Sequence, residues 1–146
     1  MNTRRQCLAA LLGGALPGLG LPAHAQSQAA AATVVDETWT DAARQRTVPV
    51  RLRWPDAARF AGPWPVVIFS HGLGGTRDGG SVWGEAWAAA GFVVVHLQHP
   101  GSDLAAVRGV TTTFTDQRAL RPLAGPQQRL ARLRDVGFAL DEIGRR

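Results

Sequence analysis

The run PVVIFSHGLGG at residues 65–75 constrains the fold of this chain more than any other stretch. Its first half is apolar and β-branched, a pattern typical of a strand covered on both faces. The strand stops at Ser70 and His71, and the glycines that follow allow the backbone to turn sharply. In open α/β sheets, sites form at the carboxyl ends of strands. The run therefore predicts a buried strand that delivers a loop to a site.

A second strand and a second polar loop follow along the chain. Residues 92–97 are again apolar, and the turn-forming sequence QHPGSD occupies residues 98–103. Between the two strands, Ser81 has the side chain of a helix N-cap and Gly91 suits a helix end. The apolar residues of this helix recur at helical spacing and are Val82, Trp83, Ala86, Trp87 and Ala90. Two buried strands joined by a helix predict a crossover unit with parallel strands.

The flanking segments complete an α/β order. Residues 34–39 and 47–53 are strand candidates, and the short connection at residues 44–46 predicts that they form a β-hairpin. Pro49 lies inside the second of these strands, which predicts that this strand lies at the edge of a sheet. Residues 103–121 have weak periodicity and room for a short helix. Pro126 suits the start of a last helix. Its apolar stripe consists of Leu130, Leu133, Val136, Gly137, Leu140 and Ile143.

The N-terminus has the pattern of an export signal. Residues 1–25 combine Arg4-Arg5, an apolar stretch too short and glycine-rich to span a membrane, and the small-x-small sequence Ala23-His24-Ala25. The start also resembles a twin-arginine signal, with Cys7 in place of the usual Phe, so both export routes stay open. We predict cleavage near Ala25, a periplasmic or secreted protein without a stable membrane anchor, a flexible lead at residues 26–33, and a partial α/β domain at residues 34–146.

Charge and cysteine content exclude several classes of function. All 16 basic residues are arginine, and the formal net charge is +5. Without the two arginines of the signal, 14 arginines remain against 11 acidic residues, spread along the chain. Such a small excess predicts a solvated surface and no nucleic-acid partner. The single cysteine, Cys7, lies in the signal, so the mature chain has no disulfide and no thiolate nucleophile.

The glycine-rich loop has a direct chemical use. Backbone N–H groups exposed in a dry cleft stabilise a developing oxyanion, and the amide of Leu73 is the best placed donor. The alternative is a strand–helix turn without a catalytic role. The loop alone does not separate the two interpretations.

Two motifs in this order resemble the α/β-hydrolases. They are PVVIFSHGLGG at residues 65–75 and AGFVVVHLQHPGSD at residues 90–103, supported by VPVRL at residues 48–52 and by residues 134–143. The closest likeness is to the bacterial group related to platelet-activating-factor acetylhydrolases and described as dienelactone-hydrolase-like. It extends from about Thr33 to the last residue.

The resemblance implies acyl-ester hydrolysis by a Ser-His-Asp triad, with a small-molecule or lipid ester as substrate and no cofactor or metal. It carries over Leu73 as an oxyanion-hole donor, and His71 and Gly72 as the loop that shapes it. It carries over no triad residue, because no serine of the chain lies in Gly-x-Ser-x-Gly. We therefore expect the N-terminal portion of an exported serine esterase, with its triad beyond this chain and little activity of its own. The alternative is a non-catalytic secreted fragment or binding module, and no partner protein can be inferred.

Three other constellations have simpler explanations. Ser70 and His71 are neighbours on a strand and so point to opposite faces, which argues against a catalytic dyad. His71, His96 and His99 lack a carboxylate at a spacing suited to a metal site. The arginines of residues 118–134 fit the solvated face of a helix better than an anion or nucleic-acid site.

Overall fold

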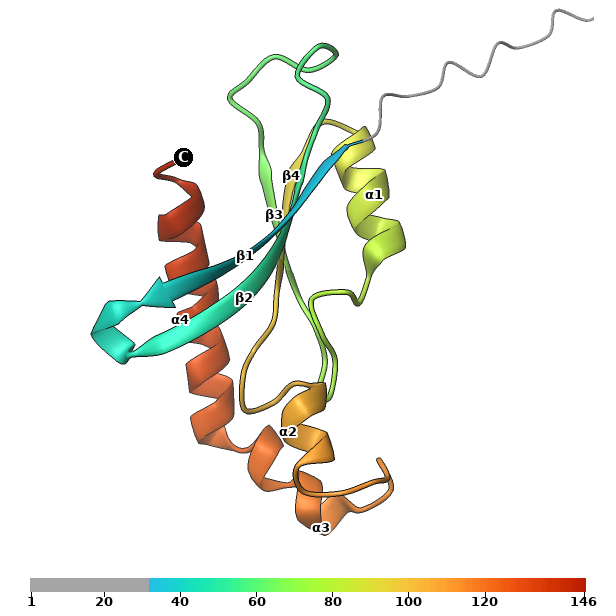
Figure 1. The fold of residues 1–146 in the computed structure, drawn as a ribbon, viewed down its shortest axis with the longest axis vertical. Coiled ribbons are helices and arrows are strands. Elements are labelled where there is room, and N and C mark those ends of the chain that lie inside the picture. The colour runs from blue at the N-terminus through green and yellow to red at the C-terminus, as the bar shows by residue number, and fades with distance from the viewer. Residues whose placement is uncertain (1–31) are drawn as a thin grey trace, which may run out of the picture.

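The computed structural model describes residues 32–146, so the predicted export signal and nearly all of the predicted lead lie outside the described residues. Within residues 32–146, four strands and four α-helices follow one another, and Figure 1 shows how they are arranged. The strands are β1 (Thr33–Asp41), β2 (Arg46–Trp54), β3 (Val66–Ser70) and β4 (Val93–Leu97). The helices are α1 (Ser81–Ala89), α2 (Leu104–Arg108), α3 (Gln117–Leu120) and α4 (Pro126–Ile143), with 3-10 turns η1 (Ala42–Arg44) and η2 (Pro122–Ala124).

The strands form one mixed sheet in the order β1-β2-β4-β3. β1 and β2 are an antiparallel hairpin, β2 pairs antiparallel with β4, and β3 pairs parallel with β4 across α1. The predicted α/β class, the hairpin and the parallel crossover unit are confirmed. The carboxyl ends of β3 and β4 therefore lie at the same edge of the sheet.

Two predictions about sheet edges were wrong. β2 is an inner strand although it contains Pro49, because the ladder to β4 runs from Val50 to Arg53 and Pro49 lies at its end. The Pro49 carbonyl still accepts the Gln98 N–H at 2.9 Å, so the missing N–H removes one bond at the end of the ladder.

The second error concerns β3, which is a half-exposed strand at the edge of the sheet. Val66 is 41% exposed and Ser70 is exposed, whereas every residue of β4 is buried. In the described part of the chain, β3 pairs only with β4, while β4 has a strand on each side and contacts both α1 and α4. An apolar run indicates that a strand is hydrophobic, but it does not indicate how many strands and helices cover it.

The main core lies between the sheet and α4. It consists of Trp39, Val48, Val50, Leu52, Val93, Val95, Leu97, Ala139 and Ile143. The predicted stripe of α4 is wrong at Leu130, Leu133 and Leu140, whose side chains are 48–69% exposed. The helix instead turns Asp135 and Ala139 toward the sheet, because Asp135 is bound there by charged groups described below.

On the opposite side of the sheet, α1 packs through its smallest residues (Figure 1). Gly84 and Ala88 are buried, whereas Val82 is 77% and Trp83 60% exposed, so the expected apolar face of this helix was also wrong. A Cβ atom on Gly84 would collide with the His96 ring, so glycine is what allows the helix this close to β4. Gly80, rather than Ser81, is the N-cap.

Candidate active site

The loops that follow β3 and β4 lie side by side at the carboxyl edge of the sheet. The Gly74 N–H donates to the Ser102 carbonyl at 2.8 Å, and the Leu104 N–H donates to the Gly75 carbonyl at 3.0 Å. The two polar stretches that were predicted from separate parts of the sequence thus form one structure.

Residues 72–75 form a turn that leaves two amides free. The Gly75 N–H donates to the Gly72 carbonyl at 3.1 Å, and Gly74 has φ +74°, which favours glycine at the third position of such a turn. Within residues 32–146, no hydrogen bond uses the N–H of Gly72 or Leu73. Free backbone N–H groups of this kind are the donors that an oxyanion would need.

The His71 side chain is buried beneath this loop and hydrogen-bonded to it. Its Nε2 accepts the backbone N–H of His99 at 3.1 Å, so its Nδ1 carries the proton and donates to the Gly72 carbonyl at 2.6 Å. Burial lowers the pKa of His71, which favours this neutral form. Both ring nitrogens are occupied, so His71 ties the Gly72 carbonyl to the backbone of His99 and is not available as a base.

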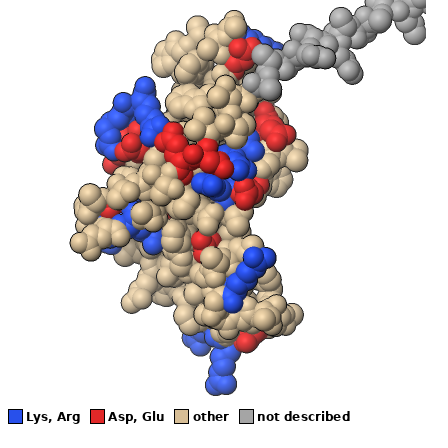
Figure 2. All heavy atoms as spheres, viewed as in Figure 1, with Lys and Arg blue, Asp and Glu red and all other residues tan. Residues whose placement is uncertain are grey.

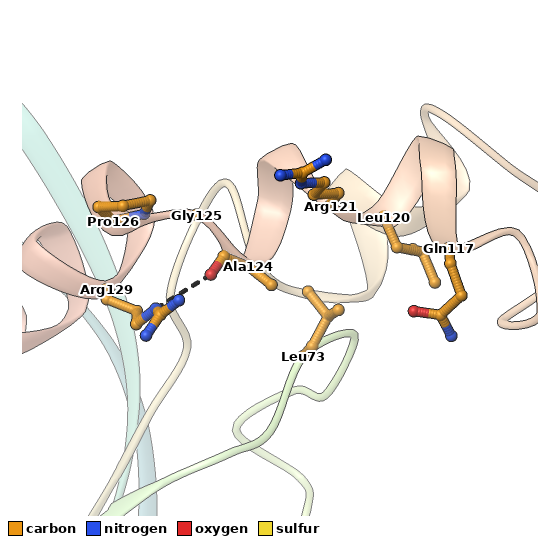
Figure 3. Close-up of a pocket in the computed structure, with 8 residues that line it drawn as sticks. All are labelled: Leu73, Gln117, Leu120, Arg121, Ala124, Gly125, Pro126 and Arg129. Carbon is orange, nitrogen blue, oxygen red and sulfur yellow. Dashed lines mark hydrogen bonds between the residues drawn. The ribbon is translucent and has the colours of Figure 1, made fainter.

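A hollow of about 460 Å³ opens beside Leu73 (Figure 3). Its other walls come from α3, η2 and the first turn of α4. The lining residues are Leu73, Gln117, Leu120, Arg121, Ala124, Gly125, Pro126 and Arg129. The loop with the free amides therefore borders a space large enough for a small ligand.

A chain of hydrogen bonds that was not predicted runs from Ser70 into the protein. The Ser70 Oγ lies 2.9 Å from the His99 Nε2, and the His99 Nδ1 lies 2.9 Å from the Asp135 Oδ2. A carboxylate only accepts, so His99 carries its proton on Nδ1 and accepts the Ser70 hydroxyl proton on Nε2. As expected, Ser70 does not bond to the side chain of its neighbour His71, but it forms a hydrogen bond with His99, which lies 29 positions later.

Asp135 is a fully buried carboxylate surrounded by donors. The Arg46 Nε and the Arg44 Nη1 donate to its Oδ1 at 2.7 and 2.9 Å, and the Arg46 Nη2 donates to its Oδ2 at 2.9 Å. Burial alone would raise the pKa of Asp135, but the hydrogen bonds from His99, Arg46 and Arg44 hold it well below its ordinary value. Asp135 thus joins α4, the hairpin and the loop after β4.

The sequence that builds this site matches a known family. The family model for platelet-activating factor acetylhydrolase, isoform II, matches residues 19–136, which is most of the chain and includes every residue of the site described above. The chain belongs to this family. No curated protein matches it. Membership in the acetylhydrolase family relates the chain to ester hydrolases and confirms the family that the two motifs resembled.

In this member of the acetylhydrolase family, Ser70, His99 and Asp135 have the connectivity of a hydrolase triad, but two features distinguish them from one. The Arg132 Nη2 donates to the Ser70 Oγ at 3.1 Å and also to the His71 carbonyl, so the hydroxyl is held between two partners. Ser70 also ends a regular strand rather than standing on a tight strand-to-helix turn. The chain of bonds ties the carboxyl end of β3 to the buried carboxylate.

Within residues 32–146, no group of three His, Cys, Asp or Glu side chains could hold a metal ion. His96 is buried alone, with its Nδ1 3.0 Å from the Gly79 carbonyl. None of the described helices is long and apolar enough to cross a membrane.

Proposed function

We propose that this chain belongs to a serine hydrolase of carboxylic esters and supplies the loop side of its oxyanion hole. The observation that carries the proposal is the pair of free amides at Gly72 and Leu73, held at the carboxyl edge of the sheet beside a ligand-sized hollow. Family membership supports the reaction class. As an ester carbonyl is attacked, its oxygen gains negative charge, and an amide already aimed at that position stabilises it without reorganisation.

In this proposal the attacking serine, the histidine base and the orienting carboxylate come from outside residues 1–146, because no serine of the sequence lies in Gly-x-Ser-x-Gly. The substrate is a small-molecule or lipid ester. The protein is exported, with the signal at residues 1–25 removed. N-terminal sequencing of the periplasmic or secreted protein should then begin at Gln26.

The test is hydrolysis of p-nitrophenyl acetate by the protein encoded by the complete gene. Leu73→Pro removes the amide proton, whereas Leu73→Ala keeps it and serves as the matched control. We expect kcat to fall roughly 10²–10³-fold in Leu73→Pro and to change only a few-fold in Leu73→Ala. Absence of hydrolysis of any short-chain ester would refute the reaction class. Equal rates in the two variants would remove Leu73 as a donor.

A second candidate is favoured by the bonds from Ser70 to His99 and Asp135. Here the Ser70 Oγ attacks the ester carbonyl while its proton passes to the His99 Nε2. The alcohol then leaves with that proton, and water releases the acid by the reverse sequence. This candidate ranks second because Arg132 also holds the Ser70 hydroxyl.

A fluorophosphonate probe separates the two candidates in residues 1–146 alone. A covalent adduct on Ser70 that disappears in His99→Gln would establish the second candidate. An unmodified protein, with no burst of nitrophenol, is the result expected if Ser70 only positions the loop.

A further inference from the structure

The arginines of this protein have different partners in the sheet and in residues 104–134. On the face shown in Figure 2, blue and red side chains touch one another over the strands, whereas blue side chains stand mostly without red neighbours toward the α2–α3 end. The six arginines of residues 104–134 form no ion pair with any residue of the described part of the chain. One of the six, Arg132 on α4, instead donates to the end of β3 and to the loop that follows it.

Arg132 binds the backbone of this loop at one peptide unit, the one between His71 and Gly72. Its Nη2 carries two protons and donates to the His71 carbonyl and, at 3.1 Å, to the Ser70 Oγ. In a trans peptide unit, the carbonyl of one residue and the N–H of the next point in opposite directions. The bond to the His71 carbonyl therefore fixes the direction of the Gly72 N–H, which is one of the two free amides of the loop.

The neighbouring peptide unit, between Gly72 and Leu73, is fixed in a different way. The Gly72 carbonyl accepts the His71 Nδ1 proton at 2.6 Å and the Gly75 N–H at 3.1 Å. Both donors belong to the loop or to the residue that begins it, so the direction of the Leu73 N–H is set locally. The direction of the Gly72 N–H, in contrast, is set from α4 through Arg132.

Packing does not hold the Gly72 peptide unit in place. Gly72 is exposed, and apart from its chain neighbours a Cβ atom there would meet no atom of the described residues within 4 Å. Glycine also adopts backbone conformations that other residues avoid, so a peptide unit beside it rotates at little cost. Without a partner on the His71 carbonyl, the Gly72 N–H would have no fixed direction.

The position of Arg132 follows from the packing of α4. Arg132 lies three residues before the buried Asp135 and so on the same face of the helix, and two arginines of the hairpin bind Asp135. Arg132 lines a hollow of about 280 Å³ that it shares with Ser70, whereas other side chains line the larger hollow beside Leu73. Arg132 is therefore placed to act on the loop and not to touch a ligand in the larger hollow.

We propose that Arg132 is a positioning residue of the oxyanion hole, which fixes the Gly72 amide as a second loop donor beside Leu73. The inference rests on the proposed function for its reaction, but the bond that carries it belongs to the described residues. A donor that is held in one direction before the reaction stabilises the developing charge without reorganisation. The bond to the carbonyl also polarises the peptide unit, which makes its N–H a stronger donor. In this role Arg132 exchanges no proton and contacts no substrate.

The kinetic test measures hydrolysis of p-nitrophenyl acetate by variants of the protein encoded by the complete gene. Arg132→Met keeps an unbranched side chain but loses every donor, so we expect kcat to fall about 10–100-fold while KM changes less than about twofold. Arg132→Lys retains a donor for the His71 carbonyl and should lower kcat only a few-fold. Arg134→Met, at an exposed arginine of the same helix, is the matched control and should behave as the wild type does.

The spectroscopic test does not depend on turnover. In the same proteins labelled with ¹³C and ¹⁵N, Arg132→Met should move the His71 carbonyl ¹³C and the Gly72 ¹⁵N resonances upfield, because both nuclei report hydrogen bonding at that carbonyl. The Leu73 ¹⁵N resonance should move much less, since its peptide unit is held within the loop. If Arg132→Met does not fold, Arg132→Lys takes its place, with a smaller shift expected at Gly72 and again little change at Leu73.

The outcomes separate this inference from the proposed function. If kcat is unchanged, or if the Leu73 resonance moves as much as that of Gly72, the positioning role is refuted even when the enzyme hydrolyses esters. A raised KM with an unchanged kcat would also refute it, because Arg132 would then bind the substrate itself. If the Gly72 resonance moves as expected but the wild type turns over no ester, Arg132 does orient the peptide unit and it is the reaction class that fails.

Discussion

The hairpin side of the molecule and the segment from α2 to the middle of α4 use the same residue, arginine, in opposite ways. On the hairpin side, Arg44 and Arg46 are bound to the buried Asp135, and Arg51 is bound to Asp36 on the neighbouring strand. In the segment 104–134, the six arginines have no carboxylate partner among the described residues, and three of them, Arg121, Arg129 and Arg132, border hollows. The first group of arginines holds elements of the fold together, whereas the second leaves positive charge without a carboxylate partner.

The contrast shows why net charge alone was a poor guide to this chain. A formal charge of +5 is modest, but pairing removes most of the positive charge from one region and leaves it in another. Fields at a site depend on which charges lack a neighbour, not on their total. The predictions that follow test the contrast, beginning with the residue on which the paired side depends most.

Removing the buried carboxylate should have the largest effect. Asp135→Ala leaves Arg44 and Arg46 without their shared partner and should lower the free energy of unfolding by about 3–5 kcal/mol. Urea denaturation followed by circular dichroism measures the change. Asp141→Asn, at an exposed carboxylate of the same helix, should stay within about 0.5 kcal/mol of the wild type. A small effect at Asp135 would mean that the buried pair is not what holds α4 in place.

Acid should weaken the fold in two steps. The pKa values of His71 and His96 are lowered by burial, so the stability that their neutral forms contribute is complete above pH 6.5 and is lost as the pH falls below it. The pKa of Asp135 lies below its ordinary 3.8, so its contribution is lost only as the pH falls further, through the folded-state value. Melting temperatures between pH 8 and pH 1 measure both steps, and Asp135→Asn should reduce only the lower one, to which Asp36, Glu37 and Asp41 also contribute through their lowered pKa values.

Removing one of the two arginine partners of Asp135 should have an intermediate effect. Arg46→Ala deletes two charged hydrogen bonds to Asp135 and one to the Pro100 carbonyl, while Arg44 and His99 continue to hold the carboxylate. We expect a loss of roughly 1.5–3 kcal/mol in the free energy of unfolding, measured by the same urea titration. A loss as large as that of Asp135→Ala would show that Arg44 contributes nothing on its own.

The exposed pair should matter least. Arg51 binds Asp36 through two nitrogens at 2.7 Å, but the pair lies on the surface. Arg51→Ala should cost about 0.2–1 kcal/mol, and 0.5 M NaCl should reduce even that difference. If Arg51→Ala destabilised the protein as much as Arg46→Ala, burial would not be what distinguishes the two pairs.

The backbone plan of this chain could be predicted from its sequence because local patterns encode it. Alternation in residues 47–53, the apolar runs at residues 66–69 and 92–97, and Pro126 each mark an element whose backbone follows from a few neighbouring residues. The candidate loop could be predicted for the same reason, since Gly72, Gly74 and Gly75 indicate a turn.

The faces of the helices and the partners of Ser70 could not be predicted in this way. α4 presents Asp135 to the sheet and leaves Leu133 exposed, because two arginines from the hairpin, about 90 positions earlier, decide its rotation. The bond between Ser70 and His99 depends on β3 and β4 being parallel neighbours with Ser70 opposite Leu97. Once that register is known, a histidine two residues beyond Leu97 becomes a natural partner for Ser70, and it was the sequence signal that we had not used.

The long span of the Asp135 contacts also bears on the order of folding. The β1–β2 hairpin closes over four residues, 42–45, whereas Asp135 reaches Arg44 across 91 positions and Arg46 across 89. Closing so long a loop is entropically costly, so we expect these bonds to form after the rate-limiting step, with φ-values near 0 at Asp135. The contacts of Asp135 would then stabilise the native state but not the transition state, so their loss accelerates unfolding while the folding rate changes little. A chevron plot of Asp135→Asn with a slowed folding arm would show instead that these contacts are already formed in the transition state.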